Sequence, residues 1–351
     1  MNFDTQAIAL LKELIEIKSI SKEEEKTASH IEHFLKDKGI EAQRIQNNVW
    51  AKNKHFSPSK PTLLLNSHHD TVKPNVGYKN DPYQAIEADG KLYGLGSNDA
   101  GGCLVSLLST FLHFYDQEIP YNLIFLASAE EEISGKEGVG LALQELGDIE
   151  FAIVGEPTLM QMAVAEKGLM VLDCTVKGKA GHAARNEGEN AIYKALPSIA
   201  WFKNYRFERE SEWLGPIKMT VTQISAGTQH NVVPDTCHFV VDVRTTDTMT
   251  NWQVLEHIEH SVDCEVVARS TRLNPSSISI EHPIIKAGES MGLKKFGSPT
   301  LSDQALMPFP SLKIGPGDSA RSHTADEYIY TNEIEEGIEL YIELLNRFFK
   351  N

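Results

Sequence analysis

The stretch Thr62-Leu63-Leu64-Leu65 leads into His68-His69-Asp70, and this transition decides how the chain folds. A short, unbroken apolar run is typical of a parallel strand that is buried on both faces. Two further runs are followed by acidic residues: 123–126 before Glu130-Glu131-Glu132, and 151–154 before Glu156. Ligands gather beyond the carboxyl ends of the strands in open α/β sheets. The three runs therefore predict that imidazole and carboxylate groups meet at one edge of one sheet.

Asp99, which follows Gly96-Ser97-Asn98, and His323 extend this candidate set. Two histidines with several carboxylates supply donor atoms that suit a pair of zinc-like ions. Asp99 also stands where the N-cap of a helix over 100–115 would stand, so it is a candidate ligand or a candidate cap.

Strand side chains alternate between faces, so His68 and Asp70 are expected to point the same way and His69 the opposite way. Asp70 would then accept the second ring N–H of His68, as carboxylates beside ligating histidines commonly do. The alternative is a polar strand end whose two histidines face solvent. For the triple acid, a solvated loop is the alternative, although it does not explain why the acids follow a buried strand.

The 351 residues suit two domains. Strands and helices alternate up to Glu156, which favours a mostly parallel sheet. After Gly168 the order becomes strand, helix, two strands, helix and strand, which indicates an α+β unit of ferredoxin-like type. The alternation of helices and strands resumes near His282, and the chain ends in a helix over 333–349. We therefore predict an α/β catalytic domain over 1–164 and 278–351, interrupted by an inserted domain over 165–277.

Composition narrows the classes of partner. The chain is 41% hydrophobic and 23% charged, as soluble globular proteins are, and its net charge of -16 argues against nucleic acid or an anionic membrane as partner. No apolar run approaches the length of a membrane span, and the first residues lack the basic start of a targeting segment. The four cysteines form no Cys-x-x-Cys pair and are typical of reduced thiols in a cytoplasmic protein.

These motifs, in this order and over nearly the whole chain, resemble the M20 family of zinc-dependent aminoacylases and exopeptidases. The similarity is greatest to the branch that contains acetylornithine deacetylase and succinyl-diaminopimelate desuccinylase. The resemblance implies a di-metal hydrolase domain with an inserted dimerisation domain, and hence a homodimer. The metals it implies are two divalent ions, zinc above all, with cobalt or manganese as alternatives.

The resemblance also implies a role for each candidate residue. One ion would be held by His68, Asp99 and Glu156, and the other by Glu132, Asp99 and His323, so that Asp99 bridges the two. Aligning Ile133-Ser134-Gly135 with the family's small-residue turn makes Glu131 the catalytic base and Glu132 a ligand. Glu130 then replaces the family's usual aspartate; a register slip of one residue would make Glu130 the base instead.

The inserted segment contains further candidates. His182, in Gly181-His182-Ala183, resembles the family histidine that reaches the partner subunit's active site and helps to polarise the scissile carbonyl. Asn231 and Arg244 match family positions that bind substrate, and the guanidinium of Arg244 suits a substrate carboxylate. The alternative for Arg244 is a salt bridge within its sheet.

The function implied is metal-dependent removal of the N-acyl group from an N-acyl amino acid, most like acetylornithine deacetylase in arginine biosynthesis. N-succinyl or N-acetyl citrulline, succinyl-diaminopimelate and dipeptides are alternative substrates. A non-catalytic relative that keeps the fold for binding is disfavoured, because neither the base nor the ligands are lost. A nucleotide-binding protein is rejected, since no Gly-x-Gly-x-x-Gly or phosphate loop follows a strand.

Overall fold

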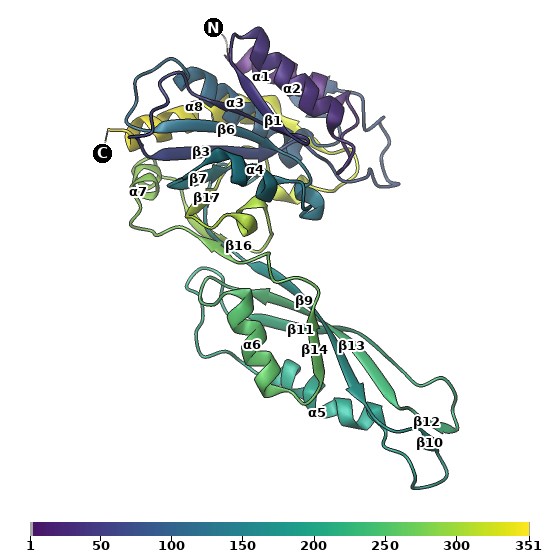
Figure 1. Ribbon diagram of the computed structural model, residues 1–351. Coiled ribbons are helices and arrows are strands. Elements are labelled where there is room, and N and C mark those ends of the chain that lie inside the picture. Colours follow the sequence, from purple (N-terminus) through teal and green to yellow (C-terminus); the bar gives the residue numbers. More distant parts are fainter. Residues whose placement is uncertain (1–2, 351) are drawn as a thin grey trace. The chain divides into compact units, whose positions relative to one another are not determined.

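The computed structural model describes residues 3–350, which form two compact units (Figure 1). Unit 1 comprises the residues before Ala165 together with Ser277–Phe296 and the residues from Ser302 onward. Unit 2 comprises Ala165–Ser276 and a second short segment, Gly297–Leu301. The sequence did not indicate that this second segment belongs to unit 2.

Seven strands of a larger mixed sheet form the centre of unit 1, in the order β1-β2-β6-β3-β7-β17-β8. Its strands are β1 (Ala42–Ile45), β2 (Asn48–Lys52), β3 (Thr62–His68), β6 (Asn122–Ser128), β7 (Phe151–Val154), β8 (Met162–Glu166) and β17 (Ser311–Lys313). The four central strands β6, β3, β7 and β17 are parallel, whereas β1, β2 and β8 pair antiparallel. A mostly parallel α/β sheet is thus confirmed, and the antiparallel strands β1 and β2 were not anticipated.

Every residue of β3, β6 and β7 is buried, because helices cover both faces of the sheet. Leu64 and Ile124 pack with helix α4 (Val139–Leu146) on one face. Phe125 points to the other face, where its ring lies 6.0 Å from that of Phe111 in α3 (Gly102–Phe114). Burial on both faces is the physical reason that these strands are apolar without alternation.

The remaining helices of unit 1 have the bounds α1 (Phe3–Ile15), α2 (Glu25–Asp37), α7 (Pro283–Ser290) and α8 (Thr331–Phe348). Helix α3 contacts both α1 and α8, and all three lie on the same side of the sheet (Figure 1). A small antiparallel sheet consists of β4 (Ile86–Ala88), β5 (Lys91–Tyr93) and β18 (Tyr328–Tyr330), and β18 immediately precedes α8 in the chain. The short strands β15 (Ser276–Ser277) and β16 (Lys295–Ser298) occur where the chain passes from one unit to the other.

Unit 2 has the ferredoxin-like element order that the sequence indicated. Its elements are β9 (Gly168–Lys177), α5 (Ala191–Asn204), β11 (Lys218–Ala226), β13 (Thr236–Thr245), α6 (Asn251–Ser261) and β14 (Glu265–Ala268). The sheet order β11-β13-β9-β14 brings the first and third of these strands to the centre and leaves β11 at an edge. A separate pair, β10 (Gly181–His182) with β12 (Val232–Val233), is antiparallel.

None of the helices within residues 3–350 combines the length and the hydropathy that a membrane crossing requires.

Candidate metal centre

His68 is the last residue of β3, and its ring is buried at the carboxyl end of the parallel strands. Its Nδ1 lies 3.0 Å from the backbone oxygen of Asp70 and 3.4 Å from the Asp70 carboxylate. A carbonyl only accepts, so Nδ1 carries the proton of that bond and Nε2 is turned toward the other candidates. Asp70 does support His68, and the closer of its two contacts is through the main chain rather than the carboxylate that we expected.

The Asp70 carboxylate also anchors the loop after β6. It accepts hydrogen bonds from the backbone N–H groups of Glu131 and Glu132, at 3.0 and 3.2 Å, and from the Ser21 hydroxyl at 2.6 Å. One buried carboxylate therefore holds both the His68 strand end and the two glutamates in register.

His69 points away from the candidate ligands, as strand alternation predicts. Its Nε2 donates to the carbonyl of Asn47 at 2.8 Å, and its Nδ1 lies 2.9 Å from the Thr27 hydroxyl. Burial lowers the pKa of His69 to about 4, so the ring is neutral and serves packing.

Asp99 lies between the two candidate histidines. Its Oδ1 is 3.3 Å from His68 Nε2 and its Oδ2 is 3.5 Å from His323 Nε2. The alternative role as an N-cap is wrong, because α3 begins at Gly102 and a short turn over Ser97–Gly101 intervenes. One carboxylate whose two oxygens face opposite histidines has the geometry of a bridging ligand.

The three glutamates after β6 point in different directions. Glu130 has a left-handed backbone (φ 55°), and its carboxylate accepts the N–H of Glu137 at 3.3 Å, within its own loop. Glu131 Oε2 lies 4.0 Å from His68 Nε2, whereas Glu132 Oε2 lies 2.9 Å from His323 Nε2. The geometry therefore favours the register in which Glu131 and Glu132, and not Glu130, face the centre.

Glu156 and His323 complete the cluster from two other segments. Glu156 follows β7, and its Oε1 lies 3.8 Å from His68 Nε2. His323 has a left-handed backbone (φ 58°) and a half-exposed side chain. The Glu132 carboxylate raises the pKa of His323 to about 9, and for His68 the Asp70 and Asp99 carboxylates overcome burial and raise its pKa well above the usual value.

Among the described residues, two groups have donor atoms that all lie within 4.8 Å of one another. They are His68 with Glu131 and Glu156, and His68 with Asp99 and Glu132. The structure thus brings together all the ligands and the base named from the sequence. The two groups share His68, whereas the resemblance implied that Asp99 would be shared.

Three buried acids around this cluster were not named from the sequence. Glu24 accepts the N–H of Glu130 at 3.2 Å, Asp303 accepts the Ser128 hydroxyl at 2.5 Å, and Glu327 accepts backbone N–H groups of the Asp99 loop. Burial raises the pKa of Asp303 to about 6, and burial with the nearby Asp99 charge raises that of Glu327 to about 8. No strand run precedes Glu24 or Glu327, and the position of Glu327 four residues after His323 was the one available signal.

Two candidates from the inserted segment lie side by side in unit 2. His182 pairs with Val232 across β10 and β12, and the N–H of Ala183 donates to the carbonyl of Asn231 at 3.0 Å. The His182 side chain is exposed, and its Nδ1 accepts the N–H of Ala184 at 3.1 Å.

Arg244 lies near the opposite end of β13 from Thr236, about 26 Å away at the rise of an extended strand. Its Nε and a terminal nitrogen contact the two carboxylate oxygens of Asp242, at 2.9 and 3.2 Å. The salt bridge within the sheet, which was the alternative for Arg244, is therefore present, and its partner lies two positions earlier on the same strand face. Its role in binding substrate stays a prediction.

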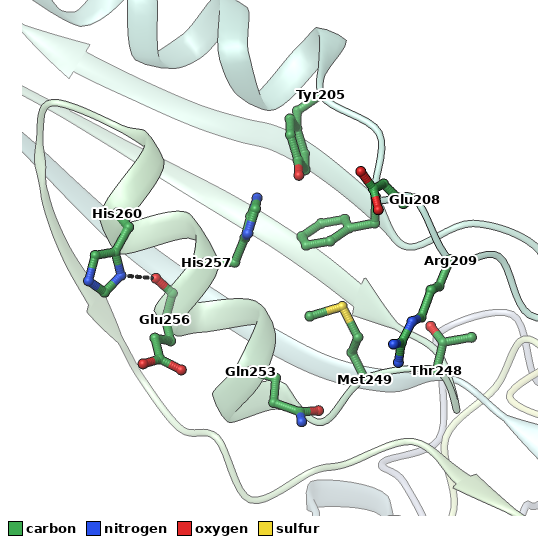
Figure 2. Close-up of a pocket in the computed structure, with 10 residues that line it drawn as sticks. Tyr205, Glu208, Arg209, Thr248, Met249, Gln253, Glu256, His257 and His260 are labelled. Carbon is green, nitrogen blue, oxygen red and sulfur yellow. Dashed lines mark hydrogen bonds between the residues drawn. The ribbon is translucent and has the colours of Figure 1, made fainter.

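Unit 2 also has an open pocket of about 650 Å³ beside α6 (Figure 2). Tyr205, Glu208 and Arg209 line one side of it, and Gln253, Glu256 and His257 of α6 line the other. The His257 ring packs on Tyr205, with ring centres 5.0 Å apart. None of the site residues named above lines this pocket, so it has no part in the metal centre.

Sequence comparison identifies relatives over most of the chain. The model of peptidase family M20/M25/M40 matches residues 64–347. An acetylornithine deacetylase from Proteus mirabilis is 28% identical over 313 residues, which cover 82% of this chain and 79% of the relative. A succinyl-diaminopimelate desuccinylase from Rickettsia bellii is 26% identical over 339 residues, which cover 88% of this chain and 83% of the relative.

Solved structures share the fold at low identity. A tripeptidase from Staphylococcus aureus superposes with a TM-score of 0.75 at 19% identity, covering 99% of each chain. A dinuclear metal-binding peptidase of the M20 family from Bacillus subtilis superposes with a TM-score of 0.74 at 17% identity, also covering 99% of each chain.

Proposed function

Because this chain belongs to peptidase family M20/M25/M40, we propose that it is a zinc-dependent amidohydrolase that removes the N-acyl group from an N-acyl amino acid. The observation that carries the proposal is the convergence of His68, Asp99 and Glu132 with Glu131 and Glu156 at one sheet edge. Binding alone does not require a set of metal donors together with Glu131, a further carboxylate that can act as a base. The cluster therefore favours catalysis over a role in binding only.

The donor chemistry fits two divalent ions. Imidazole nitrogen and carboxylate oxygen are ligands that zinc accepts, and cobalt or manganese accept the same set. His68, Asp99 and Glu156 would hold one ion, and Glu132, Asp99 and His323 the other, with Asp99 contributing one oxygen to each. When bound, such a pair supplies Lewis acidity that activates water and polarises an acyl carbonyl.

Glu131 is the group that would move protons. Burial raises the pKa of its carboxyl well above the ordinary value, and its backbone N–H is fixed by the Asp70 carboxylate. From this position it accepts a proton from the attacking water and later delivers that proton to the leaving amine. The hydrogen bond to Asp70 holds the main chain of Glu131 beside the cluster.

Acetylornithine is the substrate that we propose, with a place in arginine biosynthesis. The support is the similarity to acetylornithine deacetylases over most of the chain. Similarity to succinyl-diaminopimelate desuccinylases is almost as high, so an N-succinyl amino acid is the second candidate. N-acetyl or N-succinyl citrulline and dipeptides complete the substrate class.

A direct assay decides among these substrates. Metal-loaded protein is incubated with acetylornithine, succinylornithine, the two corresponding citrulline derivatives, succinyl-diaminopimelate and a dipeptide, and the release of free amine is measured. We expect the highest kcat/KM with acetylornithine. After a chelator has removed the metal, we expect no hydrolysis of any substrate. Hydrolysis that persists in the metal-free protein would exclude the proposed mechanism.

We further propose a homodimer in which His182 acts in the partner subunit's site. In unit 2, β11 pairs with β13 on one side, and no other strand of the described residues pairs with its outer edge. Apolar side chains are exposed on β11 (Ile224, 58% accessible) and on α5 (Tyr193 71%, Leu196 55%). A strand edge with exposed apolar neighbours favours association with a second chain. Association satisfies the free backbone hydrogen-bonding groups of the edge and buries the apolar side chains. The exposed His182 loop would then be free to contribute to another chain.

Subunit mixing tests this arrangement. Glu131→Gln and His182→Ala protein are each expected to be inactive, and after exchange their mixture should recover up to about a quarter of wild-type activity, since half of the randomly paired dimers regain one intact site. The matched control mixes Glu131→Gln protein with Asp99→Ala protein. Each of these residues belongs to the metal centre of its own chain, so both centres of every heterodimer carry a substitution and no recovery of activity is expected. If exchange is demonstrated and the first mixture stays inactive, His182 does not act in trans.

A further inference from the structure

Glu327 contacts the Asp99 loop through three backbone hydrogen bonds. It lies between His323 and β18 and is only 2% exposed. One carboxylate oxygen accepts the N–H groups of Asn98 and Asp99, each at 2.9 Å, and the other accepts that of Gly96 at 3.2 Å. Its own carbonyl accepts the N–H of Gly94 at 3.0 Å.

These N–H groups need an acceptor because their loop has no regular structure. Gly96 has φ 75°, and Asp99 has φ -120° and ψ 95°, so neither continues a helix or a strand. A buried N–H without a partner costs as much as a lost hydrogen bond. The two oxygens of a carboxyl group can accept all three of these bonds, which matches a site formed by backbone donors.

The bonds of Glu327 join two segments that each carry a proposed ligand. The Asp99 loop lies before α3, and the segment with His323 lies more than two hundred residues later. Asn98 adds a second tie, because its side chain exchanges two hydrogen bonds of 3.1 Å with the backbone of Asp318. Near these ties, Asp99 Oδ2 and His323 Nε2 lie 3.5 Å apart.

We propose that Glu327 is a positioning residue for the ion that Asp99 and His323 share, an inference that rests on the two-metal function proposed above. It does not touch an ion or the substrate. It orients the Asp99 backbone and ties it to the segment of His323, so that both donors face one point before any ion binds. Outer partners of this kind typically contribute 10–100-fold to metal affinity.

The neighbouring Asp326 provides a matched control. Its carboxylate also accepts two backbone N–H groups, those of Lys79 and Asn80 at 3.0 Å, but it is only partly buried and has no hydrogen bond to the Asp99 loop. Glu327→Gln and Asp326→Asn each exchange a carboxyl group of the same segment for an amide of nearly the same size. A general effect of losing a carboxyl group or of loosening the segment would therefore appear in both variants.

The experiment is a calorimetric titration of metal-free protein with Zn²⁺, together with the thermal unfolding of the metal-free form. We expect wild type and Asp326→Asn to bind two ions alike. We expect Glu327→Gln to bind both ions more weakly, because Asp99 contributes to each, with the larger loss, about 10–100-fold, at the ion that His323 also holds. Equal weakening of both ions, or none, in a folded Glu327→Gln protein would overturn the inference. If Glu327→Gln does not fold, Glu327→Asp, which keeps the carboxyl group but shortens its reach, should show the same unequal loss at the two ions. Wild-type binding by that variant would overturn the inference as well. A wild-type protein that binds no ion would refute the proposed function itself.

Discussion

Replacing Glu131 with glutamine is expected to abolish turnover while leaving both ions bound. The variant keeps the shape of the side chain but removes the proton acceptor, and general-base catalysis alone contributes about 10²–10⁴-fold. Because Glu131 also passes the proton to the leaving amine, we expect the loss in kcat to lie at or beyond the upper end of that range. The measurement is steady-state kinetics beside metal content by mass spectrometry.

Glu130→Gln is the matched control for this prediction. Glu130 is adjacent in sequence and buried, yet its carboxylate bonds to the N–H of Glu137 and not to the cluster. Its replacement should lower stability more than kcat, since the loop loses a charged acceptor. The opposite pattern, with Glu130→Gln inactive and Glu131→Gln near wild type, would show that the register is shifted by one residue.

Replacing Asp99 with alanine is expected to reduce the binding of both ions. Its two carboxylate oxygens face His68 on one side and His323 on the other, so removing it takes a ligand from each proposed ion. Glu156→Ala and His323→Ala should each weaken mainly one ion, because each contributes to a single group of donors. Titration of the metal-free proteins resolves the two binding events.

The comparison of these three variants tests whether Asp99 is a ligand of both ions. If each of the three variants loses only one ion to a similar degree, this assignment is wrong. Loss of both ions only in a variant of His68, the residue shared by the two donor groups of the metal-free structure, would make His68 the common ligand instead.

The sequence alone predicted the central elements of the fold and named the candidate donors. Residues 62–65, 123–126 and 151–154 predicted buried parallel strands, because only a strand covered on both faces needs side chains that are all apolar. Since parallel strands end at the same edge, the acids and imidazoles that follow them could be named as one site. The antiparallel strands β1 and β2 escaped this reasoning because their sequence has no comparable apolar run.

Only the tertiary structure decided what holds those donors in place. Three acids, Glu24, Asp303 and Glu327, stand in no sequence motif that marks them as part of the site. They accept hydrogen bonds from backbone N–H groups or a hydroxyl that are distant in the sequence. The same applies to Arg244, whose guanidinium is paired by a neighbour on its own strand, and to Glu130, whose left-handed backbone turns its carboxylate away from the cluster. The chemical type of a ligand can be read locally because its donor atoms are a property of one side chain, whereas its orientation depends on hydrogen bonds that exist only after distant segments have packed together.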